Sequence, residues 1–310
     1  MATTTSTTAP VKEVGFSARR GANWSEYIVY RPIYRESYFN RIFDYHSQKP
    51  QAVWSTAHDV GAGCGIVSSG LASRFEKIIV SDPNDGYADI ARKLLVQQSQ
   101  LPETKFHFLQ EPAEKSSVEA GTVDLIIAAE CIQWTDVDVA IQEFNRQLKT
   151  CGTLAVTYYT RPRIVGNEQA QKIWDALWEA WCEGASSELV DHALAIINTG
   201  LESVALPQDS WKGVERIYIN THGSLEPFRL NHLSADSRVG AGERRVWEEG
   251  DEDWYDEKDI DWLKAYYATW VPLVPESEIQ DLWKELARAL NGAKAKIETP
   301  IVLVLATKSA

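Results

Sequence analysis

The chain has few cysteines and no long apolar run. Its four cysteines, in 310 residues, include no C-x-x-C pair and no Cys/His cluster, so we expect packed, reduced thiols and no metal site. No stretch approaches the roughly 20 consecutive apolar residues that a membrane-spanning helix needs. The start, MATTTSTTAPVKE, lacks the basic and apolar regions of a secretory signal. These absences predict a cytoplasmic protein with residues 1–14 as a disordered tail.

Basic residues are also in short supply. The sequence holds 31 Lys and Arg against 44 Asp and Glu, a formal net charge of −13. Such a charge repels phosphate backbones and anionic lipid surfaces. We therefore expect a small-molecule substrate and neither a nucleic-acid nor a membrane partner, while the oligomeric state stays open. Any anionic substrate would need a few well-placed cations.

Short apolar runs alternate with turns and helical stretches between residues 56 and 129. The runs are STAHDV, KIIVSD, TKFHFLQ and TVDLIIAA, and the last has the continuous apolar character of a strand buried on both faces. Helical spacing marks residues 67–75 and 89–98, and a fifth run, TLAVTYY, follows Gly152. This alternation predicts an α/β fold with a mostly parallel, right-handed sheet.

The character of the chain changes after Tyr159. A tryptophan-rich helical stretch and then polar segments predict a helical cap or insertion after the fifth strand, and the chain closes with a helix near residues 276–290 and the apolar run PIVLVLATK. The predicted parts are N-terminal helices at 15–50, a ligand-binding core at 51–160, a substrate-binding cap at 161–272, and a closing helix and strand at 273–310.

The most informative stretch is AHDVGAGCGIVSSGLA. Asp59, Gly61, Gly63 and Gly65 follow the first strand and precede a helix. Glycines there let the backbone turn sharply and let a ligand approach the exposed amide groups. A turn of this kind also serves as a tight connection without a ligand, so it is weak evidence by itself.

Two further residues narrow the interpretation. The dinucleotide fingerprint G-x-G-x-x-G needs a glycine where Ile66 stands, or Ser68 if the motif starts two residues later, which disfavours a nicotinamide oxidoreductase. Asp82 ends the second strand, 23 residues after Asp59. A carboxylate at that edge of the sheet can accept hydrogen bonds from both hydroxyls of a ribose.

The glycine turn and Asp82 together resemble those of the class I S-adenosylmethionine-dependent methyltransferases, over roughly residues 27–159. The resemblance implies a Rossmann-like sheet and S-adenosylmethionine as the cofactor. It further implies that the turn wraps the methionine part, that Asp82 holds the ribose, and that the AAECIQW segment borders the active site. The implied cofactor-binding residues are Tyr30, Asp59, Gly61, Gly63, Gly65, Asp82, Ala113, Glu114 and Glu130.

Three shorter segments, EYIVYRPIY, IQWTD and DWLKAYYATW, are similar to the trans-aconitate methyltransferase-like group. This similarity implies that Tyr27, Tyr30 and Arg31 belong to an N-terminal lid over the cofactor and that Trp270 lines the substrate site. The sequence departs from the group at Gln133, where a histidine usually precedes the tryptophan. The departure leaves the substrate open.

Methyl transfer depends mainly on positioning, so no nucleophile is required. Candidates for residues that position the methyl acceptor are Gln133 and Trp134. The first hypothesis is O-methylation of a di- or tricarboxylic acid to a methyl ester, because a carboxylate is already ionised and an arginine can grip a second carboxylate. The alternatives are methylation of a phenol or amine in specialised metabolism, or a cofactor-binding protein without catalysis.

Arg161 is the preferred clamp because it follows the fifth strand at the carboxyl edge of the sheet. Other candidate cations are Arg19, Arg20, Arg163, Arg229, Arg244 and Arg245, whereas His222 and His232 are interpreted as structural. The predicted substrate-binding residues are Tyr27, Gln133, Trp134, Tyr159, Arg161, Arg229 and Trp270.

Overall fold

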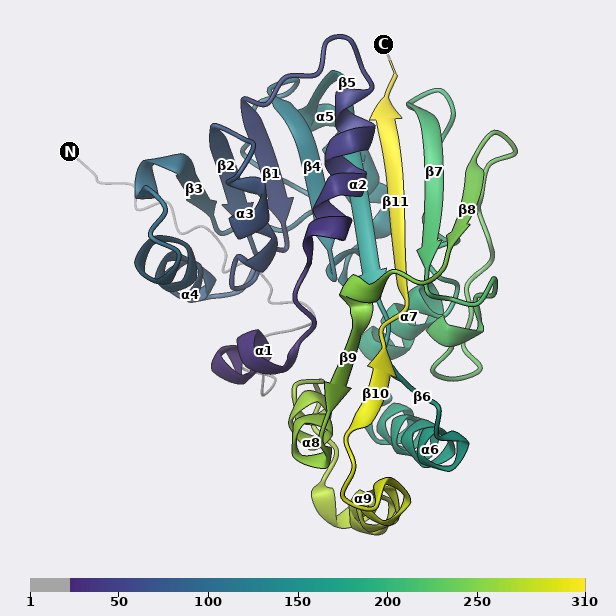
Figure 1. Ribbon diagram of the computed structural model, residues 1–310. Helices are drawn as coiled ribbons and strands as arrows, with labels where there is room; N and C mark the ends of the chain where they lie inside the picture. Colours follow the sequence, from purple (N-terminus) through teal and green to yellow (C-terminus); the bar gives the residue numbers. More distant parts are fainter. Residues whose placement is uncertain (1–22, 310) are drawn as a thin grey trace, which may run out of the picture.

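The computed structural model describes residues 23–309, and its centre is an eight-stranded sheet with the order β3-β2-β1-β4-β5-β11-β7-β8 (Figure 1). The first five of these pair in parallel. β11 is antiparallel to both of its neighbours, and β8 is parallel to β7. The strands are β1 (Thr56–Val60), β2 (Lys77–Ser81), β3 (Phe106–Leu109), β4 (Val123–Ala129), β5 (Leu148–Tyr159), β7 (Trp211–Ile219), β8 (Arg244–Glu248) and β11 (Ile301–Lys308). The α/β class and the mostly parallel sheet are confirmed.

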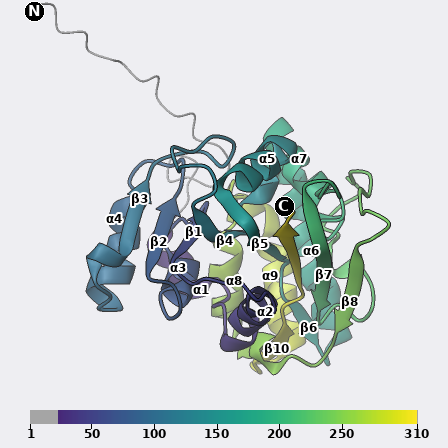
Figure 2. The ribbon, with the colours of Figure 1, turned by 90° about the horizontal axis from the view of Figure 1, so that it is seen from above.

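Helices cover both faces of this sheet. Seen from above, α2 (Glu36–Ser47) and α3 (Ile66–Leu71) lie on one face, and α5 (Val137–Gln147) and α7 (Glu188–Ile197) on the other (Figure 2). Each set buries an apolar stripe: Ile42 and Leu71 belong to one buried cluster, and Phe144 and Leu194 to the other. α4 (Tyr87–Arg92) runs on into a π-helix, Lys93–Gln98.

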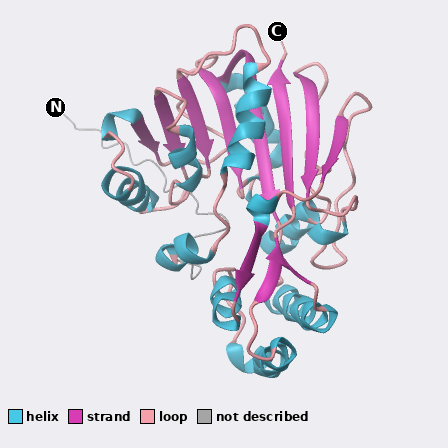
Figure 3. Ribbon diagram, viewed as in Figure 1, coloured by secondary structure: helices cyan, strands magenta, loops and turns pink. Residues whose placement is uncertain are grey.

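A second, three-stranded sheet lies beyond the carboxyl ends of the parallel strands (Figure 3). It pairs β6 (Arg163–Val165), β10 (Ala295–Glu298) and β9 (Tyr255–Lys258) in antiparallel fashion. The helices α6 (Glu168–Ala185), α8 (Ile260–Ala268) and α9 (Glu276–Leu290) pack around it. Buried aromatic rings of these helices and of the segment after α8 contact one another and include Trp174, Trp178, Tyr266, Trp270 and Trp283.

The predicted cap at 161–272 does not form a single structural unit outside the large sheet. Its helices α6 and α8 do lie outside the large sheet, but β7 and β8 are part of that sheet. β8 forms an edge whose Arg244 and Arg245 pair with Glu215 and Glu202. Within residues 23–309, no helix combines the length and apolar character needed to cross a membrane. The predicted tail at 1–14, with Arg19 and Arg20, lies outside the described residues.

Candidate functional site

A cavity open to solvent lies at the carboxyl ends of β1, β2 and β4. This is the edge at which open α/β sheets bind their ligands. The wall is completed by α1 (Trp24–Tyr30), by α7 and by the segment after α8. Among the predicted site residues, those in the lining are Tyr27, Asp59, Gly61, Gly63, Asp82, Ala113, Glu114, Glu130, Gln133, Trp134 and Trp270.

The glycine turn is shaped by two close approaches. Gly61 has φ +64°, and a Cβ atom there would lie 2.4 Å from Cβ of Cys131 on the loop after β4. Gly63 has φ +52°, and its Cβ would lie 2.9 Å from the ring of Trp24 on α1. Gly65, in contrast, is the N-cap of α3 and packs towards Leu95, outside the lining. Only glycine satisfies both the backbone angle and the space at Gly61 and Gly63.

Asp82 ties the turn to the end of β2. Its Oδ2 accepts the Gly63 amide hydrogen at 2.9 Å, and its Oδ1 accepts the Asn84 backbone and side-chain amides, both at 2.9 Å. The carboxylate is 5% exposed and lines the cavity. The hydrogen bonds therefore fix the orientation of a carboxylate in the cavity lining.

Asp59 lies deeper, at the end of β1. Ser68 donates to its Oδ2 at 2.6 Å. Burial, and to a smaller extent the nearby charge of Asp82, raises the pKa of Asp59 to about 7. A bound cation would favour the ionised form of this side chain.

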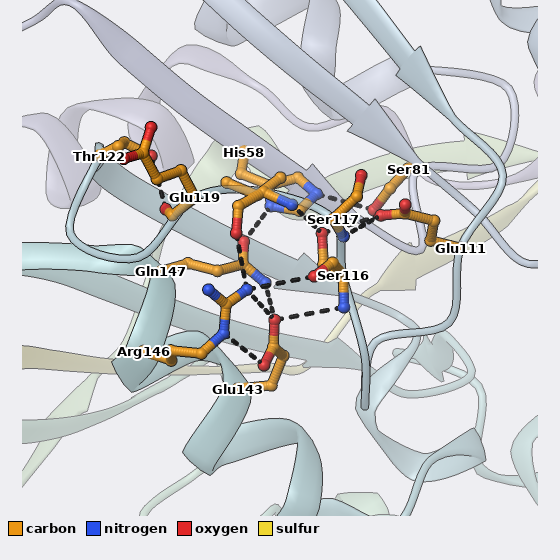
Figure 4. A network of polar contacts seen from close by, with 11 residues as sticks. His58, Ser81, Glu111, Ser116, Ser117, Glu119, Thr122, Glu143, Arg146 and Gln147 are labelled. Carbon is orange, nitrogen blue, oxygen red and sulfur yellow. Dashed lines mark hydrogen bonds and ion pairs between the residues drawn. The ribbon is translucent and has the colours of Figure 1, made fainter.

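The loop that carries Ala113 and Glu114 is anchored by a polar network (Figure 4). Glu143 and Arg146 of α5 pair at 2.6 Å, and Arg146 donates to the carbonyl groups of Ser116 and Val118. The network continues through Gln147 to His58 at 2.7 Å, and His58 contacts Ser81, the neighbour of Asp82 in sequence. Burial lowers the pKa of His58 to about 4, so its imidazole is neutral near pH 7.

The loop itself is held at both ends. Glu111 accepts from the hydroxyl group of Ser116 and from the amide of Ser117, both at 2.9 Å. Glu114 accepts the amide hydrogen of Asp136, the N-cap of α5, at 2.9 Å. The loop at the predicted adenine position is thereby fixed relative to α5.

Glu130 occupies a left-handed backbone conformation, φ +57°, directly after β4. Its Oε1 accepts the amide hydrogen of Tyr159 at 2.6 Å, and its backbone oxygen accepts from Nε2 of Gln133 at 3.1 Å. Desolvation raises the pKa of Glu130 to about 8, against the opposing effects of that amide and of Arg31. Glu130 is therefore a lining residue whose pKa lies close to neutral pH.

Arg31 is the single cation among the described residues that line this cavity. It is 8% exposed and donates to Oγ1 and to the carbonyl oxygen of Thr269 at 2.9 and 3.2 Å. The rings of Trp270, Tyr27 and Tyr266 lie 4.7, 5.0 and 5.5 Å from its guanidinium carbon. These contacts link the segment after α1 to the end of α8 and hold a positive charge at the cavity wall.

One side of the cavity is apolar. α7 contributes Val190, Ala193, Leu194 and Ile197, and Trp181, Trp270 and Val271 extend this wall. α7 was not assigned to the site from the sequence. Its apolar spacing identifies a buried face, but the same spacing is produced by packing against a core and by packing against a ligand.

Five predicted site residues lie outside the lining. Gly65 packs as described above, and Tyr30 is partly buried against the core. Tyr159 is buried, and its ring centroid lies 6.0 Å from that of Tyr34. Arg161 pairs with Asp175 at 2.9 Å, and the exposed Arg229 pairs with Glu226 at 2.9 Å.

The other candidate cations are also engaged elsewhere. Arg163 and His222 both pair with the buried Glu298. Arg244 pairs with Glu215 on β7, and Arg245 pairs with Glu202 in the connection between α7 and β7. Lining residues that the sequence did not single out include Trp24, Tyr34, Asn84 and Tyr158. Trp24 follows Asn23, whose side chain caps α1, but a cap does not indicate what the helix covers.

Comparisons with known proteins identify relatives of this chain. A family model described as a methyltransferase domain matches residues 58–156. Methyltransferase cfoB of Aspergillus candidus is 30% identical, over 94% of this chain and 97% of its own length. Methyltransferase ptaI of Pestalotiopsis fici is also 30% identical, over 92% of both chains.

Among solved structures, a protein of Anaeromyxobacter dehalogenans described as a type II methyltransferase aligns with a TM-score of 0.58 and 18% identity, covering 89% of this chain and 97% of its own. That likeness concerns the fold. The whole-length relatives, the glycine turn and the carboxylate at the end of β2 together identify the chain as a member of the class I S-adenosylmethionine-dependent methyltransferases.

Proposed function

We propose that this methyltransferase transfers a methyl group to the carboxylate oxygen of a planar, largely apolar small molecule, giving a methyl ester. The observation that carries the proposal is the pairing of an apolar wall, built by α7, with one buried guanidinium, that of Arg31. Such a pocket suits a ligand with an apolar body and a single anionic group.

The chain's own residues divide between cofactor and acceptor. Bound S-adenosylmethionine supplies an electrophilic methyl group on a positively charged sulfur. Asp82 would accept the ribose hydroxyls, and the loop with Ala113 and Glu114 would flank the adenine. Asp59 and Glu130, whose pKa values are raised to about 7 and about 8 in the ligand-free protein, would stabilise the cofactor's positive charges.

Positioning would supply most of the catalysis. Trp134, Trp270 and the α7 wall would hold the acceptor and exclude water, while Arg31 orients its carboxylate. A carboxylate is ionised near neutral pH and needs no general base. Among the described residues of the lining there is no histidine or lysine, which agrees with a reaction of this kind.

The positions of the candidate arginines argue against a di- or tricarboxylic acid as the substrate. Arg161 and Arg229 are not in the lining, and each pairs with a carboxylate of its own. A second substrate carboxylate would therefore find no second cation among the described lining residues. We propose a single carboxylate.

A phenol remains the second candidate, and Glu130 is the observation that favours it. A carboxylate whose pKa is raised to about 8 can accept a proton from a phenol in the transition state. The relatives named above are fungal proteins, which is compatible with either acceptor in specialised metabolism.

The test supplies methyl-labelled S-adenosylmethionine with matched acceptors: naphthoic acids, naphthols and naphthylamines. We expect dilute alkali to hydrolyse the labelled product. Dilute alkali hydrolyses a methyl ester but leaves an aryl methyl ether intact. Arg31→Gln should reduce kcat/KM on the acids by more than tenfold, whereas Arg229→Gln, a matched change at an exposed arginine, should not. Faster transfer to the naphthols than to every acid would overturn the proposal in favour of the phenol.

A further inference from the structure

Gln133 holds a buried hydrogen-bond acceptor in the wall of the cavity. It is the middle residue of the short helix η4 (Ile132–Trp134), is 5% exposed and belongs to the lining. Its Nε2 donates to the backbone oxygen of Glu130 at 3.1 Å. A carbonyl oxygen can only accept, so this contact fixes which end of the amide is the NH₂ group and turns the amide oxygen elsewhere.

That oxygen, Oε1, has no hydrogen-bond partner among residues 23–309. η4 lies against α7, whose cavity-lining side chains Ala193, Leu194 and Ile197 have no donor to offer. The nearby hydroxyl of Thr135 donates instead to the backbone oxygen of Ile132 at 2.7 Å. Nothing on the adjoining wall therefore satisfies Oε1.

A buried acceptor left without a donor costs free energy, and native proteins rarely keep one. An ordered water is a poor substitute here, because a buried water needs two or more polar partners and α7 offers apolar side chains. The missing donor is most simply brought by a ligand.

We propose that Gln133 is a specificity-determining residue that accepts a hydrogen bond from a hydroxyl or N–H group of the methyl acceptor. The acceptor class is then an apolar aromatic acid that carries a hydrogen-bond donor besides its carboxylate. This inference rests on the proposed carboxyl methylation and adds to it the second polar group of the substrate.

The experiment measures kcat/KM for a set of hydroxylated naphthoic acids, the corresponding methoxy ethers and the unsubstituted parent acid. In the wild-type enzyme one hydroxylated isomer should be preferred by roughly tenfold or more over both its ether and the parent, because only the hydroxyl donates. In Gln133→Leu that preference should fall to about unity, with the parent acid affected least. Gln133→Met serves as a second variant, and circular dichroism verifies the fold of each.

Thr135→Val is the matched control, because its hydroxyl is satisfied within the protein and its loss should leave the preference unchanged. Equal rates on hydroxyl and methoxy compounds, or a preference that survives in both Gln133 variants, would overturn the inference and indicate that Oε1 binds water. A loss of S-adenosylhomocysteine affinity in Gln133→Leu without a change of preference would overturn it in favour of a cofactor contact. If none of the acids is methylated while a naphthol is, the proposed function fails first.

Discussion

Replacing Gly61 by alanine should destabilise the protein through one identifiable contact. The added Cβ would lie 2.4 Å from Cβ and 2.8 Å from Sγ of Cys131, whereas the next atom, Cα of Cys131, is 3.9 Å away. Adopting φ +64° costs an alanine about 1 to 2 kcal/mol, and overpacking typically adds about 1 to 3 kcal/mol. We expect the free energy of unfolding to fall by about 2 to 5 kcal/mol.

Two comparisons separate the cost of the backbone conformation from the cost of the close contact with Cys131. Gly86 has φ +75° and no atom within 4 Å of its would-be Cβ, so Gly86→Ala should show the backbone cost alone, about 1 to 2 kcal/mol. Cys131→Gly removes both clashing atoms, so in a double-mutant cycle it should recover at least about 1 kcal/mol of the Gly61→Ala loss. Urea unfolding followed by tryptophan fluorescence measures the stability of the wild type and of the four variants. If Gly61→Ala costs no more than Gly86→Ala, or if the cycle shows no coupling, the close approach of the two loops is not what requires glycine.

Three further substitutions test the rest of the site. Asp82→Ala should weaken binding of S-adenosylmethionine by about 1.5 to 3 kcal/mol in calorimetry, and should also lower stability because the Gly63 amide loses its acceptor; unchanged affinity would contradict the ribose assignment. Because the pKa of Glu130 is raised from 4.5 to about 8, this group contributes stability below pH 4.5 that is lost as the pH rises to about 8. The stability advantage of Glu130→Gln over wild type should therefore grow across that range in pH-dependent urea titrations, and a constant difference would refute the shift. Arg31→Lys keeps the charge but not the planar contacts with Thr269 and the rings, so thermal unfolding should report a loss of about 1 to 3 kcal/mol, and equal stability would show that charge alone suffices.

The parts of the site that the sequence predicted are those built by neighbouring residues. The glycine turn, Asp59 and Asp82 depend on a strand, a turn and the next strand, whose pattern is legible in one short segment. Asp59, Gly61, Gly63 and Asp82 lie in the cavity lining, whereas Gly65 does not. The closing helix was likewise predicted at 276–290, the range the structure gives, because its apolar spacing is regular.

What the sequence could not decide was which arginine faces the cavity. Arg31 is held by Thr269, 238 residues away, and Arg161 is turned to Asp175 on α6. Both choices are made by contacts between distant segments, and no local pattern distinguishes them. The same reason applies to β7, which the sequence assigned to the cap and which joins β11 inside the large sheet.

The edge strand β8 has a consequence for self-association. Edge strands leave backbone donors and acceptors free to pair with a second chain. Here the edge carries Arg244 and Arg245, each tied to a carboxylate on the same molecule, and any chain that added alongside would have to displace or desolvate these charges. Beneath this edge, β7 ends in the fully buried Tyr218 and Ile219. A deletion that removed β8 would leave the backbone groups along that side of β7 unpaired, and we expect such a protein to self-associate through strand addition.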